Sequence, residues 1–199
     1  MLCLITNRNV VVHGDIIDLI HTINRSEVDR IILREKDLST EVLLDLAKKM
    51  KDALRSSSTQ LLINGSVKVA KEVGAYGVHF PFDLFQNSDE RFGITGVSIH
   101  SVEEALYAEE KGADYLIAGH IYDTNCKLGL EARGHGYLRA VCEAVSIPVI
   151  AIGGIKVRNI PDVKAEGACG IAVMSTINGA LNPLQKVQEY QAALSVFKD

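Results

Sequence analysis

Glycines and a serine stand where two of the apolar runs in the sequence end. Gly153 and Gly154 follow the run Pro148–Ile152, and Ser175 follows Gly170–Met174. Residues without a β-carbon let backbone amides approach an anion closely, and a serine adds a hydroxyl donor. These three residues predict a phosphate-binding site. The alternative interpretation is a tight turn beside a serine that caps a helix.

A second group of polar residues follows the earlier apolar runs: Arg34, Lys36, Asn64, Ser98, His100, His120 and Lys127. Histidine titrates near neutrality and transfers protons, while arginine and lysine pair with carboxylates and phosphates. Arg34 and Lys36 alternate along an extended segment and should share a face. No HExxH-like spacing or convergent pair of aspartates accompanies these residues, so we predict no metal site.

His79 and the cysteines have structural interpretations of equal or greater weight. His79 lies inside an apolar run, where a hydrogen-bonded core residue and a site residue are equally consistent with the sequence. Cys3, Cys142 and Cys169 lie in apolar segments typical of packed thiols. The cysteines form no CxxC pair, and we expect reduced thiols in a cytoplasmic protein.

Eight short apolar runs must position these side chains: Leu2–Thr6, Arg30–Leu33, Gln60–Ile63, Gly77–Phe80, Ile94–Ser98, Asp114–Ala118, Pro148–Ile152 and Gly170–Met174. Helical patterns such as Thr40–Leu54 and Val102–Lys111 separate them, and Gly74, Gly112 and Gly167 predict left-handed helix ends. About 25 residues per unit suit a barrel of strand–helix pairs. We predict an α/β fold, a single (β/α)8 TIM barrel domain over residues 1–199, with its site at the carboxyl ends of the strands.

Composition narrows the class of ligand. Basic residues number 21 against 25 acidic ones, and 47% of the chain is hydrophobic. No basic run indicates nucleic acid, and no apolar run approaches the ~20 residues that cross a membrane. We therefore expect a cytoplasmic protein that binds a small molecule. The sequence leaves a homo-oligomer open.

Several segments together resemble the thiamine phosphate synthase superfamily over nearly the whole chain. They are residues 32–39 (ILREKDLS), 62–64 (LIN), 77–79 (GVH), 96–101 (GVSIHS), 112–115 (GADY) and 147–155 (IPVIAIGGI). The resemblance implies a barrel with a shared phosphate site. The synthase of this superfamily joins a pyrimidine diphosphate to a thiazole phosphate and requires magnesium.

The chain departs from the synthase pattern where magnesium is bound. Gly65 follows Asn64 in place of the usual aspartate. The residues after His79, FPFDL, replace the usual small residue, glutamine and acidic residues. Asp83 is a substitute only with a one-residue shift. The loop after the sixth apolar run has His120 after Gly119, where the synthase favours proline.

These departures resemble the thiazole tautomerase branch of the superfamily. The resemblance implies an isomerase, without cofactor or metal, that aromatises a thiazole phosphate carboxylate by proton transfer through His120. The expected substrate contacts are Arg34, Lys36, Asn64, Ser98 and Lys127, and the phosphate contacts are Gly153, Gly154 and Ser175. The alternatives are a thiamine phosphate synthase, a transferase that releases diphosphate, and a metabolite-binding regulator without catalysis.

Overall fold

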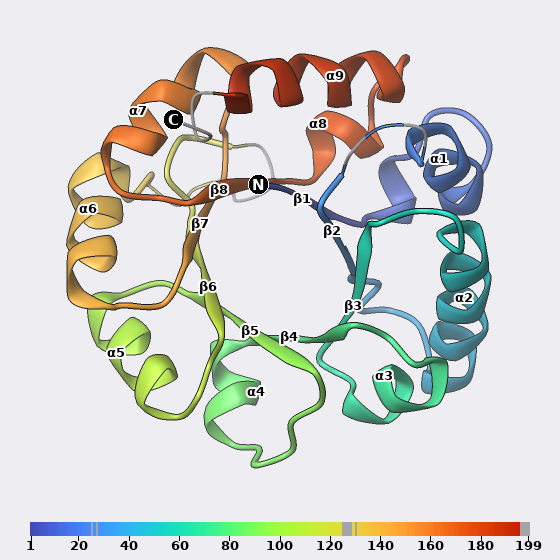
Figure 1. Ribbon diagram of the computed structural model, residues 1–199, viewed down its shortest axis with the longest axis horizontal. Helices are drawn as coiled ribbons and strands as arrows, with labels where there is room; N and C mark the ends of the chain where they lie inside the picture. The colour runs from blue at the N-terminus through green and yellow to red at the C-terminus, as the bar shows by residue number, and fades with distance from the viewer. Residues whose placement is uncertain (25, 27, 125–128, 130, 196–199) are drawn as a thin grey trace.

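Eight parallel strands close into a barrel in the computed structural model, which describes residues 1–24, 26, 28–124, 129 and 131–195 (Figure 1). The strands are β1 (Leu2–Ile5), β2 (Arg30–Leu33), β3 (Gln60–Asn64), β4 (Gly77–Pro81), β5 (Ile94–Ile99), β6 (Tyr115–Gly119), β7 (Val149–Ile152) and β8 (Gly170–Val173). Each strand pairs with its sequence neighbour, and β8 returns to pair with β1. The predicted (β/α)8 fold is confirmed, with every strand boundary within one residue of its prediction.

Helices surround the barrel on its outer side (Figure 1). They are α1 (Ile16–Ile23), α2 (Thr40–Ala53), α3 (Val67–Val73), α4 (Phe82–Gln86), α5 (Val102–Glu110), α6 (Gly134–Ala144), α7 (Ile160–Ala165), α8 (Ser175–Asn178) and α9 (Pro183–Leu194), with 3-10 turns η1 (Arg8–Val10) and η3 (Val157–Asn159). Ser101 caps α5 by accepting a hydrogen bond from the Glu104 amide at 3.1 Å, and Gly74 ends α3 with φ of 61°. Within the described parts of the chain, no helix is both long and apolar enough to span a bilayer.

Alternation along each strand divides the core into two parts. One set of strand residues packs outward against the helices, as Leu4, Ile31 and Val97 do. The other set fills the barrel: Cys3, Ile5, Ile32, Leu62, Tyr115, Ile117, Ile150 and Ala172. Side chains at inward positions near the carboxyl ends of the strands are therefore the ones that can line a site there.

Gly96 gives the Tyr115 ring its place inside the barrel. The two residues are paired across β5 and β6, and the ring is 1% exposed. A β-carbon at Gly96 would lie 2.1 Å from Cζ of Tyr115. The glycine is therefore a packing requirement rather than a flexible point.

Gly96→Ala should destabilise the protein by about 1–3 kcal/mol, because the buried ring must shift to admit a methyl group. Gly136→Ala is the matched control, since nothing lies within 4 Å of its added β-carbon and it stands within α6. That variant should be neutral or about 0.5–1 kcal/mol more stable. Urea unfolding of both variants measures the difference. Equal effects would show that Gly96 is not required by packing.

His79 lies in the barrel interior next to Tyr115. Its side chain is 2% exposed, with Nδ1 3.0 Å from the Tyr115 hydroxyl and Nε2 2.8 Å from Oγ of Ser98. These contacts match the interpretation of His79 as a hydrogen-bonded core residue. Burial lowers the pKa of His79 from 6.5 to about 3, and the positive charges of Arg34 and Arg30 act in the same direction. His79 is therefore neutral at pH 7.

The lowered pKa of His79 predicts that stability falls in mild acid. The unfolded chain takes up this proton as the pH falls below about 6.5, whereas the folded chain resists it until about 3. The contribution is complete above pH 6.5, and about 2 kcal/mol of it is lost by pH 5. Urea unfolding at pH 7 and pH 5 should show a larger loss for the wild type than for His79→Gln. Equal losses in both proteins would contradict a neutral buried His79.

Candidate active site

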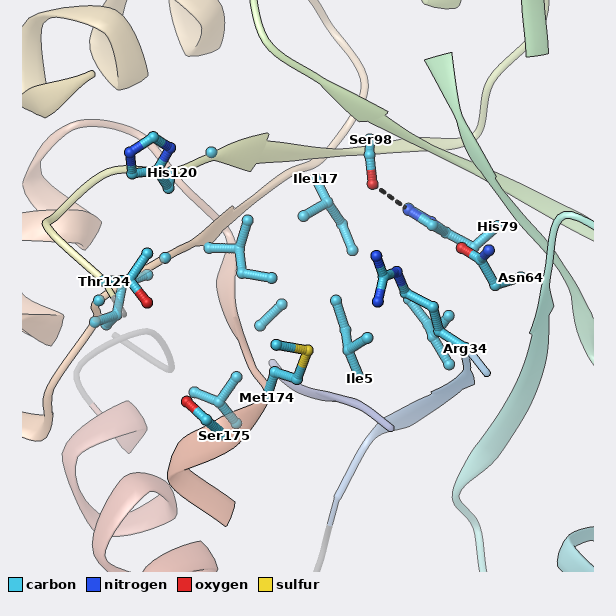
Figure 2. A pocket seen from close by; sticks show the side chains of 18 of the residues that line it. Ile5, Arg34, Asn64, His79, Ser98, Ile117, His120, Thr124, Met174 and Ser175 are labelled. Carbon is cyan, nitrogen blue, oxygen red and sulfur yellow. Dashed lines mark hydrogen bonds between the residues drawn. The ribbon is translucent and has the colours of Figure 1, made fainter. Parts of the chain in front are cut away.

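A cavity of about 330 Å³ opens at the carboxyl ends of the strands. Its floor is apolar and is formed by Ile5, Ile32, Ile117, Ile152, Ala172 and Met174. Polar side chains surround this floor, and Figure 2 shows Arg34 and Ser175 on opposite sides of it. The shape suits a flat apolar ring that carries charged groups at its edges.

Arg34 and Lys36 form the cationic side of the cavity. Both follow β2, and both line the cavity as their alternation predicts. The Arg34 amide donates to Oγ1 of buried Thr6 at 2.9 Å, which holds this segment against the end of β1. Among the described residues, neither Arg34 nor Lys36 forms an ion pair. Their charges are available to an anionic ligand.

The acidic residues of the same segment point elsewhere. Glu35 and Asp37 both bind Arg8, with Nη1 of Arg8 3.1 Å from Glu35 and Nη2 2.6 Å from Asp37. Hydrogen bonds to Arg8 lower the pKa of Asp37 to about 2. Alternation thus sends the cations inward and the carboxylates toward Arg8.

Strands β3, β4 and β5 supply a polar wall from their inward positions. Asn64 is paired with His79 across β3 and β4, and Ser98 lies two residues beyond Gly96 on β5. Asn64, His79 and Ser98 therefore all face the cavity, as Figure 2 shows. His100 also lines the cavity, next to Ser101, which caps α5.

Segments after β6 and β7 pack tightly against each other. The amides of Ile121 and Tyr122 donate to the carbonyls of Ile152 and Gly153 at 2.9 and 3.0 Å. A β-carbon on Gly153, whose φ is 101°, would lie 2.3 Å from Cβ of His120. Contact with the β6 loop therefore requires a glycine here, whatever ligand the segment binds.

Gly154, like Gly153, must be a glycine because it packs against the segment after β6. His120 lies at the same edge of the cavity. Gly154 has φ of 64°, and an added β-carbon would lie 2.3 Å from the carbonyl oxygen of Asp123. His120 is 4% exposed and lines the cavity with both glycines. The expected cluster of His120, Gly153 and Gly154 is therefore present as a structural unit.

Ser175 opens the four-residue helix α8 instead of capping it. The cap residue is Met174, and it makes no side-chain cap hydrogen bond, so the interpretation of Ser175 as a helix cap is wrong. A helix this short also has few aligned peptide dipoles to offer an anion. Ser175 is exposed and lines the cavity together with Thr176.

Most of the predicted site residues share this one cavity. They are Arg34, Lys36, Asn64, Ser98, His120, Gly153, Gly154 and Ser175. Lys127, the remaining candidate, lies outside the described residues. Thr124 and Thr176 were not predicted, although each lies close in sequence to a candidate, His120 or Ser175. Their position in the segments that follow β6 and β8 was the signal that would have found them.

The cavity does not fit the magnesium ion that the resemblance implies. No aspartate or glutamate is found among the described residues that line it, and none of the described residues form a cluster of three or more potential metal ligands. Gly65 has no side chain to offer. Asp83 lies on α4, exposed and outside the cavity lining. Asp83 therefore does not act as a shifted substitute.

Comparison with known proteins gives consistent relatives. The family model described as thiamine monophosphate synthase (TMP-TENI) matches residues 2–177. A thiamine-phosphate synthase of Pyrococcus abyssi is 37% identical over 79% of this chain and 78% of its own length. A thiamine-phosphate synthase of Clostridium tetani is 34% identical over 89% of this chain and 88% of its own length. The structure of thiamine phosphate pyrophosphorylase from Pyrococcus furiosus has a TM-score of 0.85 and 29% identity, covering 100% of this chain and 96% of its own.

These relatives overturn the predicted thiazole tautomerase. Those at 33–39% identity are named thiamine-phosphate synthase, a transferase, so the isomerase prediction centred on His120 is wrong. The tautomerase prediction rested on the missing aspartate at Gly65 and on His120 in the loop after β6, and neither feature excludes a synthase. His120 also packs against Gly153, a contact that says nothing about proton transfer. The superfamily itself was predicted correctly from strand-end motifs spread along the barrel. The chain belongs to the thiamine monophosphate synthase family.

Proposed function

We propose that the protein is a thiamine-phosphate synthase, which joins a pyrimidine diphosphate to a thiazole phosphate and releases diphosphate. The names of the relatives support this function. The observation that carries it in the structure is a cavity with two polar ends separated by an apolar floor. Two phosphorylated rings that must meet need such an arrangement.

Arg34 and Lys36 are the proposed contacts of the diphosphate. The transfer breaks the bond between the pyrimidine and its diphosphate, forms a bond to the thiazole, and leaves the electron pair on the diphosphate. Negative charge therefore grows on the leaving group as the bond breaks. Two cations without acidic partners among the described residues stabilise that charge where it develops.

Gly153, Gly154 and Ser175 are the proposed contacts of the thiazole phosphate. The glycines leave the backbone uncovered at the cavity edge, and Ser175 adds a hydroxyl across the floor from Arg34. Asn64 and Ser98 are placed to orient a ring that lies on the floor between the two ends. A ring held between two fixed anions is brought close to its reaction partner, which lowers the entropic part of the barrier.

Purified protein incubated with the pyrimidine diphosphate and the thiazole phosphate should form thiamine phosphate and diphosphate in equal amounts. Chromatography measures the first product and a coupled phosphate assay the second. Parallel reactions with Mg²⁺ and with EDTA report whether a metal from solution is needed, since the described cavity lining offers it no carboxylate. Binding of both substrates without either product would contradict the proposed transferase and indicate a binding protein.

Arg34→Met should lower kcat/KM for the pyrimidine diphosphate about 10–100-fold, because a hydrogen bond to a charged group contributes about 1.5–3 kcal/mol. Arg158→Met is the matched control. Arg158 is exposed on η3 and does not line the cavity, so its loss should leave the rate unchanged. The same loss in both variants would mean that overall charge, and not the cavity contact, is responsible.

A further inference from the structure

A chain of hydrogen bonds runs from the barrel interior to the cavity wall. The Tyr115 hydroxyl lies 3.0 Å from Nδ1 of His79, and Nε2 of His79 lies 2.8 Å from Oγ of Ser98. Figure 2 shows the second contact directly, with Ser98 at the cavity. Tyr115 does not line the cavity, so it acts on a ligand only through His79 and Ser98.

Arg30 fixes the inner end of this chain. Its guanidinium carbon lies 4.6 Å from the centroid of the Tyr115 ring, and Nε donates to Oε1 of Gln60 at 2.9 Å. Arg30 therefore holds the Tyr115 ring through its face. Among the described residues, Nδ1 of His79 is the only hydrogen-bond partner of the Tyr115 hydroxyl.

The direction of the hydrogen bonds follows from the burial of the Tyr115 hydroxyl. Because this hydroxyl is buried, its proton needs an acceptor, and the only one in reach within the described part of the chain is Nδ1 of His79. Burial also raises the pKa of Tyr115, so the phenol keeps that proton. A neutral imidazole carries one ring proton, which must then lie on Nε2 and point to Oγ of Ser98. Among the described residues, Ser98 has no other hydrogen-bond partner for its hydroxyl. Its own proton is therefore left for the cavity.

We propose that Arg30, Tyr115 and His79 are positioning residues that make the Ser98 hydroxyl a hydrogen-bond donor to the ligand. The opposite direction would consume the Ser98 proton in a bond to His79 and leave Ser98 able only to accept. The wall at Ser98 then selects a ligand atom that accepts, such as an unprotonated ring nitrogen, over an amino or N–H group. The ligand part of this inference rests on the proposed function, whereas the direction of the chain does not.

The direction is tested without any ligand by long-range ¹H–¹⁵N correlation spectra of the ¹⁵N-labelled full chain at pH 7. His79→Gln identifies the His79 signals by their loss. We expect the shift of a protonated nitrogen at Nε2 and of an acceptor nitrogen at Nδ1. A proton on Nδ1 would overturn the proposal, whatever reaction the protein catalyses.

Tyr115→Phe tests whether the phenol sets this state. It removes the donor to Nδ1 while keeping the ring that packs against Gly96, and thermal unfolding checks that the variant folds. The Nε2-protonated form should give way to a mixture of tautomers. Tyr76→Phe, at an exposed tyrosine, is the control and should leave the spectrum unchanged. An unaltered His79 spectrum in Tyr115→Phe would exclude Tyr115 as a positioning residue.

The effect on the ligand is measured by titrating each of the two phosphorylated rings separately. Ser98→Ala should weaken the binding of one ring about 10-fold, and Tyr115→Phe should weaken the same ring by a smaller factor. Tyr76→Phe should bind both rings as the wild type does. Equal affinity of the wild type and Ser98→Ala for both rings would overturn the ligand part. A negative transferase assay would contradict the proposed function, but the spectra and these titrations would still test the role of Ser98.

Discussion

The alternation of side chains along parallel strands is the constraint on which the site depends. A strand residue points either into the barrel or toward the helices, and a shift of one residue would exchange the two sets. Pairing of Asn64 with His79, and of His79 with Gly96, keeps three neighbouring strands in step. The polar wall of the cavity is a direct product of that register. The same register places Gly96 opposite Tyr115, where only a residue without a side chain leaves room for the ring.

The charged side chains described around the cavity are of one sign. The described lining contains Arg34, Lys36 and histidines but no carboxylate, although the chain as a whole carries a net charge of −4. A low-dielectric floor strengthens the attraction of these cations for an anion and excludes water from it. The cavity therefore favours phosphorylated ligands more than the composition of the protein suggests, and this bias does not require a metal held by the protein.

Much of the fold was predictable from sequence because each unit carries its own local signals. Apolar runs marked the strands to within one residue, and Gly74, Gly112 and Gly167 have the positive φ expected of helix ends. Site residues at strand ends were equally visible, since barrel topology brings those ends together. Tyr115 was not recognised, because its importance comes from the partners that lie across the barrel. The function was predicted wrongly because a histidine in a loop has the same appearance whether it moves a proton or packs against a glycine.

Arg8 does not line the cavity, yet it pairs with the two carboxylates that alternate with the cations of the cavity. By holding Glu35 and Asp37 on the far side of the segment after β2, it keeps two carboxylates away from two neighbouring cations. Both acids next to Arg34 and Lys36 in sequence therefore have a cationic partner outside the cavity, and the charges of Arg34 and Lys36 stay available to an anion. A residue outside the cavity, Arg8, thus supports its preference for anions by binding the Glu35 and Asp37 carboxylates elsewhere.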